Sequence, residues 1–184
     1  MIKEFLEHDH QSLSVLLDNL DRSFELSNPA PAYELLDLFW ARLATHIRAE
    51  HLCLFPAILN ADAELFRGRG LPSLDQVRVA IARLREDHNF FMDQLAEAVK
   101  IMREVVSQPE TNGTRLLIDQ ARHKIAAVKQ RLVEHNTVEE GQVYQWAAVL
   151  LSPQELARLT AEVRHQAEAL PHRFASSSNG KACP

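Results

Sequence analysis

The sequence predicts an all-α protein, an up-down-up-down four-helix bundle with a short fifth C-terminal helix. Three observations lead to this prediction. Leucine and alanine dominate over valine and isoleucine, and the chain has only 5 glycines. Apolar residues recur at steps of three and four along four long stretches. Short connections rich in Pro, Asn and Gly separate most of these stretches. With 184 residues, we expect one domain over residues 1–170 and a flexible, Ser-rich tail over 171–184.

The first predicted helix covers residues 2–27, and the second covers about 32–60. Asn28-Pro29-Ala30-Pro31 separates them, and Pro31 fits the first turn of the second helix, where an N–H is not needed. Pro56 lies within the second pattern and predicts a kink. The inward stripe of the first helix is Leu6, His10, Leu13, Leu17, Leu20 and Phe24. That of the second is Leu36, Phe39, Leu43, His46, Glu50 and Leu54.

The second half of the chain repeats this arrangement. Residues 61–73 form the one long connection, which Gly68-Arg69-Gly70-Leu71-Pro72 marks as irregular. Ser73 and Gln76 resemble a capping box at the start of a third helix that runs to about 107. A turn over 108–113 leads to a fourth helix over roughly 114–151. Ser152-Pro153-Gln154-Glu155 then begins a fifth helix of about 16 residues, which ends before Pro171.

Composition excludes several classes of function. The net charge of −5 and the pI near 6.0 argue against a nucleic-acid surface. No run of 18 apolar residues is long enough to span a membrane. No signal peptide is recognisable, and Cys53 and Cys183 make no disulfide framework. We therefore expect a cytoplasmic protein.

A His-x-x-x-Glu motif occurs twice, as His46/Glu50 and as His135/Glu139. Residues four apart on a helix share one face, so each pair points in one direction. The first and third helices each add an inward histidine within a matching stretch, Leu6-Glu7-His8-Asp9-His10 and Leu84-Arg85-Glu86-Asp87-His88. This internal duplication predicts four helix faces arranged around one axis.

Imidazole and carboxylate together favour iron, manganese or zinc over calcium or magnesium. A lone inward histidine is more often a hydrogen-bonded core residue, but four in matched registers favour metal binding. A buried glutamate needs a cation or donors, and no Lys or Arg shares these stripes. Two bridging glutamates and four histidines would give each of two ions two nitrogens and two oxygens. The candidate metal ligands are His10, His46, Glu50, His88, His135 and Glu139.

Other residues near these motifs receive different interpretations. His8 would replace His10 as a ligand only if the predicted register of the first helix were wrong. His51 is interpreted as a residue that contacts the metal ligands or faces solvent. Cys53 is interpreted as a small core residue, and Tyr144 as core packing or as a donor to a metal-bound ligand. Gly141 indicates either a close backbone approach or a π-bulge. His123 lies off the helix face of His135, and His165 and His172 are interpreted as surface residues.

The order of these motifs resembles the haemerythrin-like family, the HHE cation-binding domains. The match runs through His10, His46/Glu50, His88 and His135/Glu139, and Leu54-Phe55-Pro56 also resembles the family. It covers roughly residues 2–150 and implies a four-helix bundle with two iron ions in a non-haem, oxo- or hydroxo-bridged centre. Oxygen-carrying members have a second histidine one turn along the third helix, where this chain has Leu84 and Met92. The missing nitrogen ligand favours sensing, or reaction with peroxide or nitric oxide, over reversible oxygen storage.

The leading hypothesis is a di-iron protein that binds or senses O2, NO, peroxide or iron level. One alternative is a di-iron enzyme of the peroxidase or oxidase type, so catalysis stays open. Another is a metal-free helical interaction module. Zinc or manganese would also suit the donor set. Any signal would need a protein partner, which the sequence does not identify.

Overall fold

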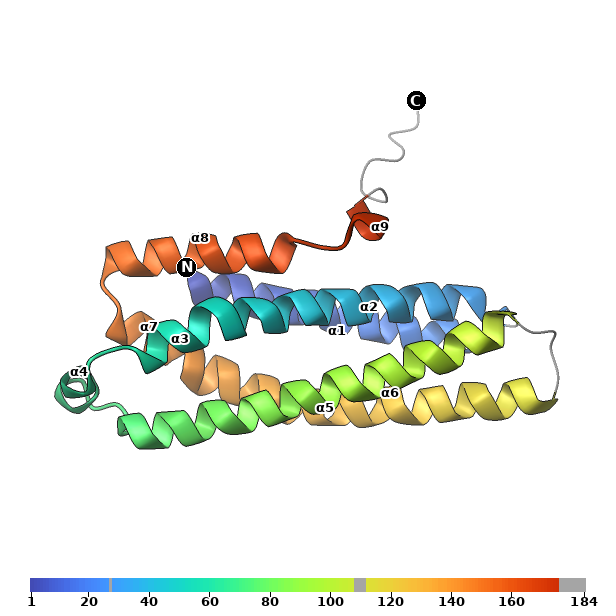
Figure 1. Ribbon diagram of the computed structural model, residues 1–184, viewed down its shortest axis with the longest axis horizontal. Coiled ribbons are helices and arrows are strands. Elements are labelled where there is room, and N and C mark those ends of the chain that lie inside the picture. The colour runs from blue at the N-terminus through green and yellow to red at the C-terminus, as the bar shows by residue number, and fades with distance from the viewer. Residues whose placement is uncertain (27, 108–111, 176–184) are drawn as a thin grey trace, which may run out of the picture.

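The computed structural model describes residues 1–26, 28–107 and 112–175, and over these ranges the chain is helical with no strand (Figure 1). The first half contains α1 (Ile2–Ser23) and α2 (Ala30–Ala49). A π-helical turn over Glu50–Leu54 joins α2 to α3 (Phe55–Leu59), and α4 (Ala63–Gly68) follows. The prediction of an all-α protein is confirmed.

The second half contains the two longest helices, α5 (Leu74–Ser107) and α6 (Asn112–Val138). A second π-helical turn over Glu139–Val143 joins α6 to α7 (Tyr144–Leu150). The chain then forms α8 (Pro153–Glu168) and the short α9 (His172–Ala175).

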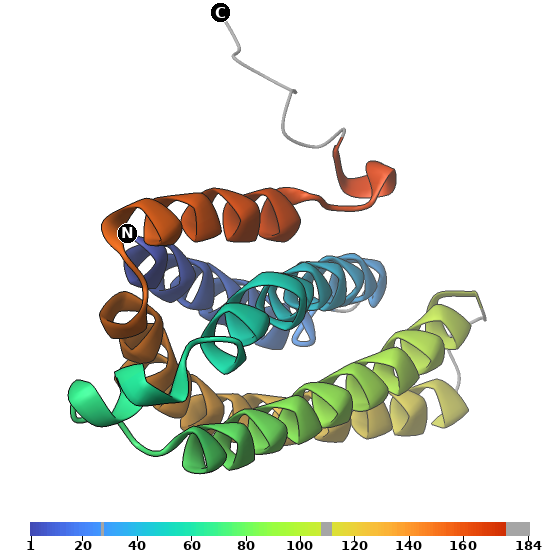
Figure 2. The same cartoon turned by 60° about the vertical axis from the view of Figure 1, so that its left-hand side comes forward.

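The long helices pack side by side. Helix α1 packs along α2, α5 packs along α6, and α2 also contacts α5. Figure 1 shows the chain reversing its direction from each of these helices to the next. Helix α8 lies against α1 and α2, on the side away from α5 (Figure 2). Within the described part of the chain, no helix has the length and apolar character needed to cross a membrane.

Two helices begin with the capping boxes that the sequence predicts. Gln76 N–H donates to Ser73 Oγ at 3.3 Å, and Ser73 N–H donates to Gln76 Oε1 at 2.9 Å. Ser152 and Glu155 make the same reciprocal pair at the start of α8. Each pair satisfies N–H groups that the first helical turn leaves free.

Several predicted boundaries were wrong. Helix α1 ends at Ser23 rather than 27. The connection over 61–73 is not wholly irregular, because the Asp62 side chain accepts from Glu64 N–H and caps α4. The second and fourth predicted helices each contain a π turn, which an apolar period of 3.6 does not distinguish from α-helix. The predicted turn over 108–113 lies mostly outside the described residues, as does the tail beyond 175.

Two apolar clusters form the core, one on each side of a polar layer. The first gathers residues that precede His10 on α1 and His88 on α5, together with α3, α7 and α8. The second gathers residues that follow these histidines, together with α2 and α6. The inward histidines and glutamates therefore lie in the middle of a well-packed interior.

Candidate metal centre

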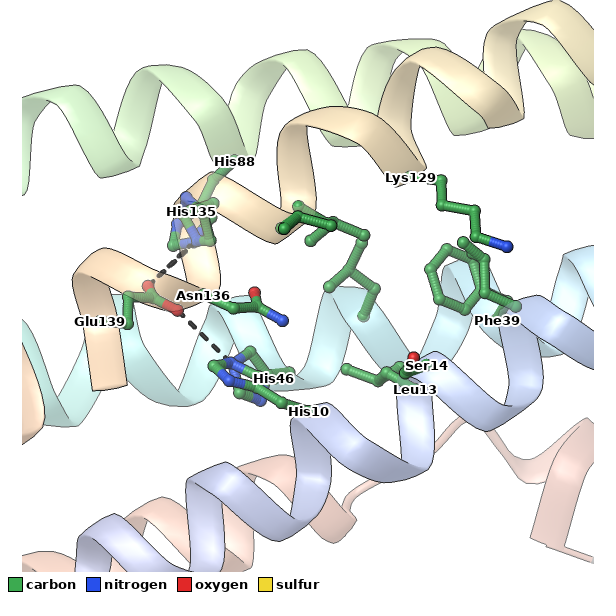
Figure 3. Close-up of a pocket in the computed structure, with 14 residues that line it drawn as sticks. His10, Leu13, Ser14, Phe39, His46, His88, Lys129, His135, Asn136 and Glu139 are labelled. Carbon is green, nitrogen blue, oxygen red and sulfur yellow. Dashed lines mark hydrogen bonds and ion pairs between the residues drawn. The ribbon is translucent and has the colours of Figure 1, made fainter. Parts of the chain in front are cut away.

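The six predicted ligands meet at one buried centre (Figure 3 shows five of them). Helices α1, α2, α5 and α6 supply one histidine each, and the two π turns begin with the glutamates. The histidines are at most 5% exposed, and both glutamates are 0% exposed. Because His8 is exposed, the choice of His10 over His8 agrees with the observed orientation of α1.

The four imidazoles form two pairs with their Nε2 atoms turned inward. His10 Nε2 lies 3.1 Å from His46 Nε2, and His88 Nε2 lies 2.9 Å from His135 Nε2. One pair joins α1 to α2 and the other joins α5 to α6. The arrangement therefore has the two-fold repeat that the sequence predicts.

Both glutamates span the two imidazole pairs. Glu139 Oε2 lies 3.4 Å from His10 Nε2, and its Oε1 lies 3.1 Å from His135 Nε2. Glu50 Oε1 lies 3.5 Å from His46 Nε2, and its Oε2 lies 3.4 Å from His88 Nε2. Two groups of atoms are close enough to hold one metal ion each, His10/His46/Glu139 and His88/His135/Glu139.

The outward Nδ1 atom of each histidine has its own partner. Carboxylates contact three of them: Asp9 reaches His46 at 2.9 Å, Asp87 reaches His135 at 3.1 Å, and Glu140 reaches His10 at 2.8 Å. The fourth, His88 Nδ1, lies 2.8 Å from His51 Nε2. Such contacts fix the ring orientation and the tautomer of metal-binding histidines.

These partners make the inward nitrogens suitable for a cation. An ionised carboxylate only accepts, so Nδ1 of His10 and of His46 carries the proton. In the neutral rings the two Nε2 lone pairs then face one another, which is unfavourable unless a proton or a metal ion lies between them. Within the described residues, Glu50 Oε2 and Glu139 Oε1 are also buried without a hydrogen-bond donor. A buried charged oxygen without a partner is costly, and metal ions would satisfy both features.

The carboxylates and imidazoles of the centre shift one another's pKa values. Burial lowers the pKa of His46, but the charge of Glu50 and the hydrogen bond to Asp9 outweigh it, and the pKa lies well above its ordinary value. The pKa of His135 is raised for the same reasons, with Glu139 and Asp87 as partners. Burial raises the pKa of Glu139, but the surrounding imidazoles outweigh this effect and hold it well below its ordinary value.

Tyr144 reaches the centre because of the second π turn. Five residues along an α-helix would rotate it about 140° away from Glu139. In the π turn, Tyr144 N–H instead donates to the Glu139 carbonyl, so the two side chains share a face. The phenol donates to Glu50 Oε1 at 2.9 Å and lies 3.1 Å from His10 Nε2. Burial first, and then both glutamate charges, raise the pKa of Tyr144 well above its ordinary value and keep the donor protonated.

The two halves of the centre are not equivalent. Phe55 occupies the position after the first π turn that Tyr144 occupies after the second, and its ring stacks near His88. Similarly, His51 follows Glu50 where Glu140 follows Glu139. The half with His10 and His46 therefore carries an additional carboxylate and a phenol.

The remaining predictions have mixed outcomes. His165 and His172 are exposed, as predicted, and His123 is also exposed, off the inward face of α6. Cys53 is only half-buried, at the edge of the first apolar cluster. Gly141 lies within the second π turn, and a Cβ there would meet no atom within 4 Å. The π-bulge interpretation is therefore confirmed, and the close-approach interpretation was wrong.

Sequence reasoning missed the carboxylates that hold the histidines. Asp9 and Asp87 precede His10 and His88, yet each contacts the histidine of the neighbouring helix. Arg42 and Arg131 pair with these aspartates in turn. The signal was available, because both Asp and both Arg occupy matching positions in the internal repeat.

Comparison with known proteins identifies one family. The family model described as Hemerythrin HHE cation binding domain matches residues 1–147. No curated protein and no solved structure gives a significant match to the chain. The matched region contains all six inward histidines and glutamates, both π turns and the residues that contact Nδ1.

Proposed function

The chain belongs to the haemerythrin HHE cation-binding domain family, and on this premise we propose that it binds two iron ions in an up-down-up-down four-helix bundle. The ligands in this proposal are His10, His46, Glu50, His88, His135 and Glu139. Each glutamate would use one oxygen for each ion, since its two oxygens face different imidazole pairs. Bound iron would supply a redox-active centre with coordination positions left for a small ligand.

One observation carries the proposal. Two pairs of Nε2 atoms and two buried glutamates converge, and one oxygen of each glutamate has no hydrogen-bond donor among the described residues. A core built for stability alone would place donors against these oxygens. Mixed nitrogen and oxygen ligands favour iron, zinc or manganese, and family membership favours iron among them.

The surrounding residues would orient the side chains that bind the ions. Asp9, Asp87 and Glu140 accept from Nδ1 and hold Nε2 of their histidines toward the ions. On the side of His10 and His46, the Tyr144 hydroxyl donates a hydrogen bond to Glu50. This half of the centre therefore contains an uncharged hydrogen-bond donor.

The small ligand in this proposal is O2, NO or peroxide, and the protein would sense it or sense the supply of iron. His51 is a candidate for a fifth imidazole ligand, but its Nε2 faces His88 Nδ1 rather than the centre. The reduced number of nitrogen ligands favours sensing or peroxide chemistry over oxygen storage. A peroxidase-type activity is the second candidate, favoured by an open cavity that reaches the cluster. We place this function in the cytoplasm, with a protein partner for any signal.

The proposal is tested by purifying the chain with iron, zinc and manganese supplied equally. We expect about two iron ions per chain by elemental analysis, and anomalous diffraction at the iron edge between the imidazole pairs. His46→Ala should lower the iron content, and His123→Ala, an exposed histidine on α6, should leave it unchanged. No retained metal, together with thermal stability that a strong chelator does not alter, would refute the proposal and favour the metal-free interaction module.

A further inference from the structure

A cavity of about 110 Å³ adjoins the cluster on one side (Figure 3). One end is polar and consists of the four inward histidines, Glu139 and Asn136. The walls beyond this end are aliphatic or aromatic. They are formed by Leu13, Leu17, Phe39, Leu43 and Leu132.

The cavity opens between α1 and α6. These two helices are not among the closely packed pairs, which are α1–α2, α2–α5 and α5–α6 among the long helices. The exposed side chains of Ser14 on α1 and Val133 on α6 line the mouth, together with the partly exposed Lys129 on α6. A small molecule can therefore enter from solvent without opening the core.

The mouth does not attract anions. Lys129 Nζ lies 2.9 Å from Asp18 Oδ1 and 2.6 Å from Asp21 Oδ2. Two carboxylates against one ammonium leave this group with a net charge of −1, and the whole chain carries −5. A neutral molecule is favoured over a carboxylate or another anion.

The size of the cavity exceeds the need of a diatomic gas or hydrogen peroxide. A water molecule occupies about 30 Å³ in the liquid, so the cavity has room for roughly four heavy atoms. Apolar cavities of about 150 Å³ with similar walls bind benzene or xenon. Leucine and phenylalanine walls favour an alkyl group here, because they remove its apolar surface from water. A polar group would lose its hydrogen bonds to water and find no partner on these walls.

We propose that the cavity binds the alkyl group of a short-chain organic hydroperoxide of about four carbon atoms, with its oxygen-bearing end turned toward the cluster. The class follows from the negatively charged mouth, which disfavours anions, the apolar walls and the polar end. The choice of a peroxide head rests on the proposed function, whereas binding of the alkyl group does not need metal. Leu17 and Ser14 then determine specificity, one from the wall and one from the mouth.

The first test uses the metal-free, full-length protein and tert-butyl alcohol, an unreactive molecule with the same alkyl group and a neutral oxygen. Methyl NMR signals of Leu13, Leu17 and Leu43 should shift and saturate. Ser14→Phe should weaken binding about tenfold or more, because its ring occupies the mouth. Val15→Phe is the matched control, since Val15 is the next exposed residue on α1 and does not line the cavity. Leu17→Phe fills the wall and should weaken binding similarly, and far-ultraviolet circular dichroism checks its fold.

The second test compares tert-butyl hydroperoxide with hydrogen peroxide on the metal-loaded protein. We expect the optical spectrum to reach half of its change at a concentration about tenfold lower or more for the organic peroxide. No saturable alcohol binding, equal binding by all variants, or equal half-saturation by the two peroxides would overturn the proposal. Alcohol binding by a chain that retains no metal would support the cavity and refute the proposed function. Metal retention without alcohol binding would support the proposed function and refute the proposed binding of an alkyl group in the cavity.

Discussion

Replacing Glu139 with glutamine tests whether one carboxylate is shared by two metal ions. Glu139 belongs to both groups of atoms that are close enough to hold an ion, whereas each histidine belongs to one. Glutamine keeps the size of the side chain but has one oxygen acceptor and no charge. We therefore expect Glu139→Gln to weaken binding of both ions.

The size of the effect follows from linkage between binding and folding. A ligand present at 100 times its Kd stabilises the folded state by about 2.7 kcal/mol. Two such sites contribute roughly 5.4 kcal/mol if they are independent. In a domain of this length each kcal/mol shifts Tm by about 2–4 °C. Iron should raise the Tm of the wild-type chain by roughly 10–20 °C, and it should raise that of Glu139→Gln by a few degrees at most.

The assay is thermal unfolding with and without ferrous iron under anaerobic conditions, beside elemental analysis of each protein. Each variant is compared with its own metal-free form, so a change in intrinsic stability cancels. Glu134→Gln is the matched control, because Glu134 is an exposed residue on the same helix. A Glu139→Gln protein with two ions per chain and the full wild-type shift would show that the carboxylate is not a shared ligand.

Three further predictions follow from the surroundings of the cluster. Asp9→Asn and Asp87→Asn remove a charge that holds a histidine ring, and each should lower iron affinity about 10- to 100-fold in a metal titration; unchanged affinity would exclude the positioning role. Tyr144→Phe leaves the buried Glu50 without a donor and should destabilise the metal-free protein by about 1–3 kcal/mol in urea unfolding, and a smaller loss would mean that water replaces the phenol. In the metal-free protein the raised pKa of His46 contributes stability that is fully present below its ordinary value of 6.5 and is lost as pH rises through the folded-state pKa. Tm should therefore fall as the pH increases across this interval, and less so in His46→Gln.

Most of the fold is local in origin, and for this reason it could be predicted. The inward stripes of α1, α2, α5 and α6 repeat with the helical period, and the caps at Ser73 and Ser152 depend on neighbours three residues away. The helical period did not place the π turns; only Gly141 indicated the second one, as one of two interpretations. One additional residue in a turn changes the face of every residue that follows. Tyr144 was accordingly left open between core packing and donation to a metal-bound ligand, and in the structure it donates to Glu50 at the centre.

The sequence alone determined which helices form, which faces turn inward, and which histidines and glutamates these faces carry. These properties depend on residues three or four apart in one segment. Only the tertiary structure decided that Asp9 holds His46, that His51 contacts His88, and that α1 and α6 leave a cavity between them. The physical reason is that such contacts depend on the rotation and axial offset of one helix against another. No period within a single helix records that offset.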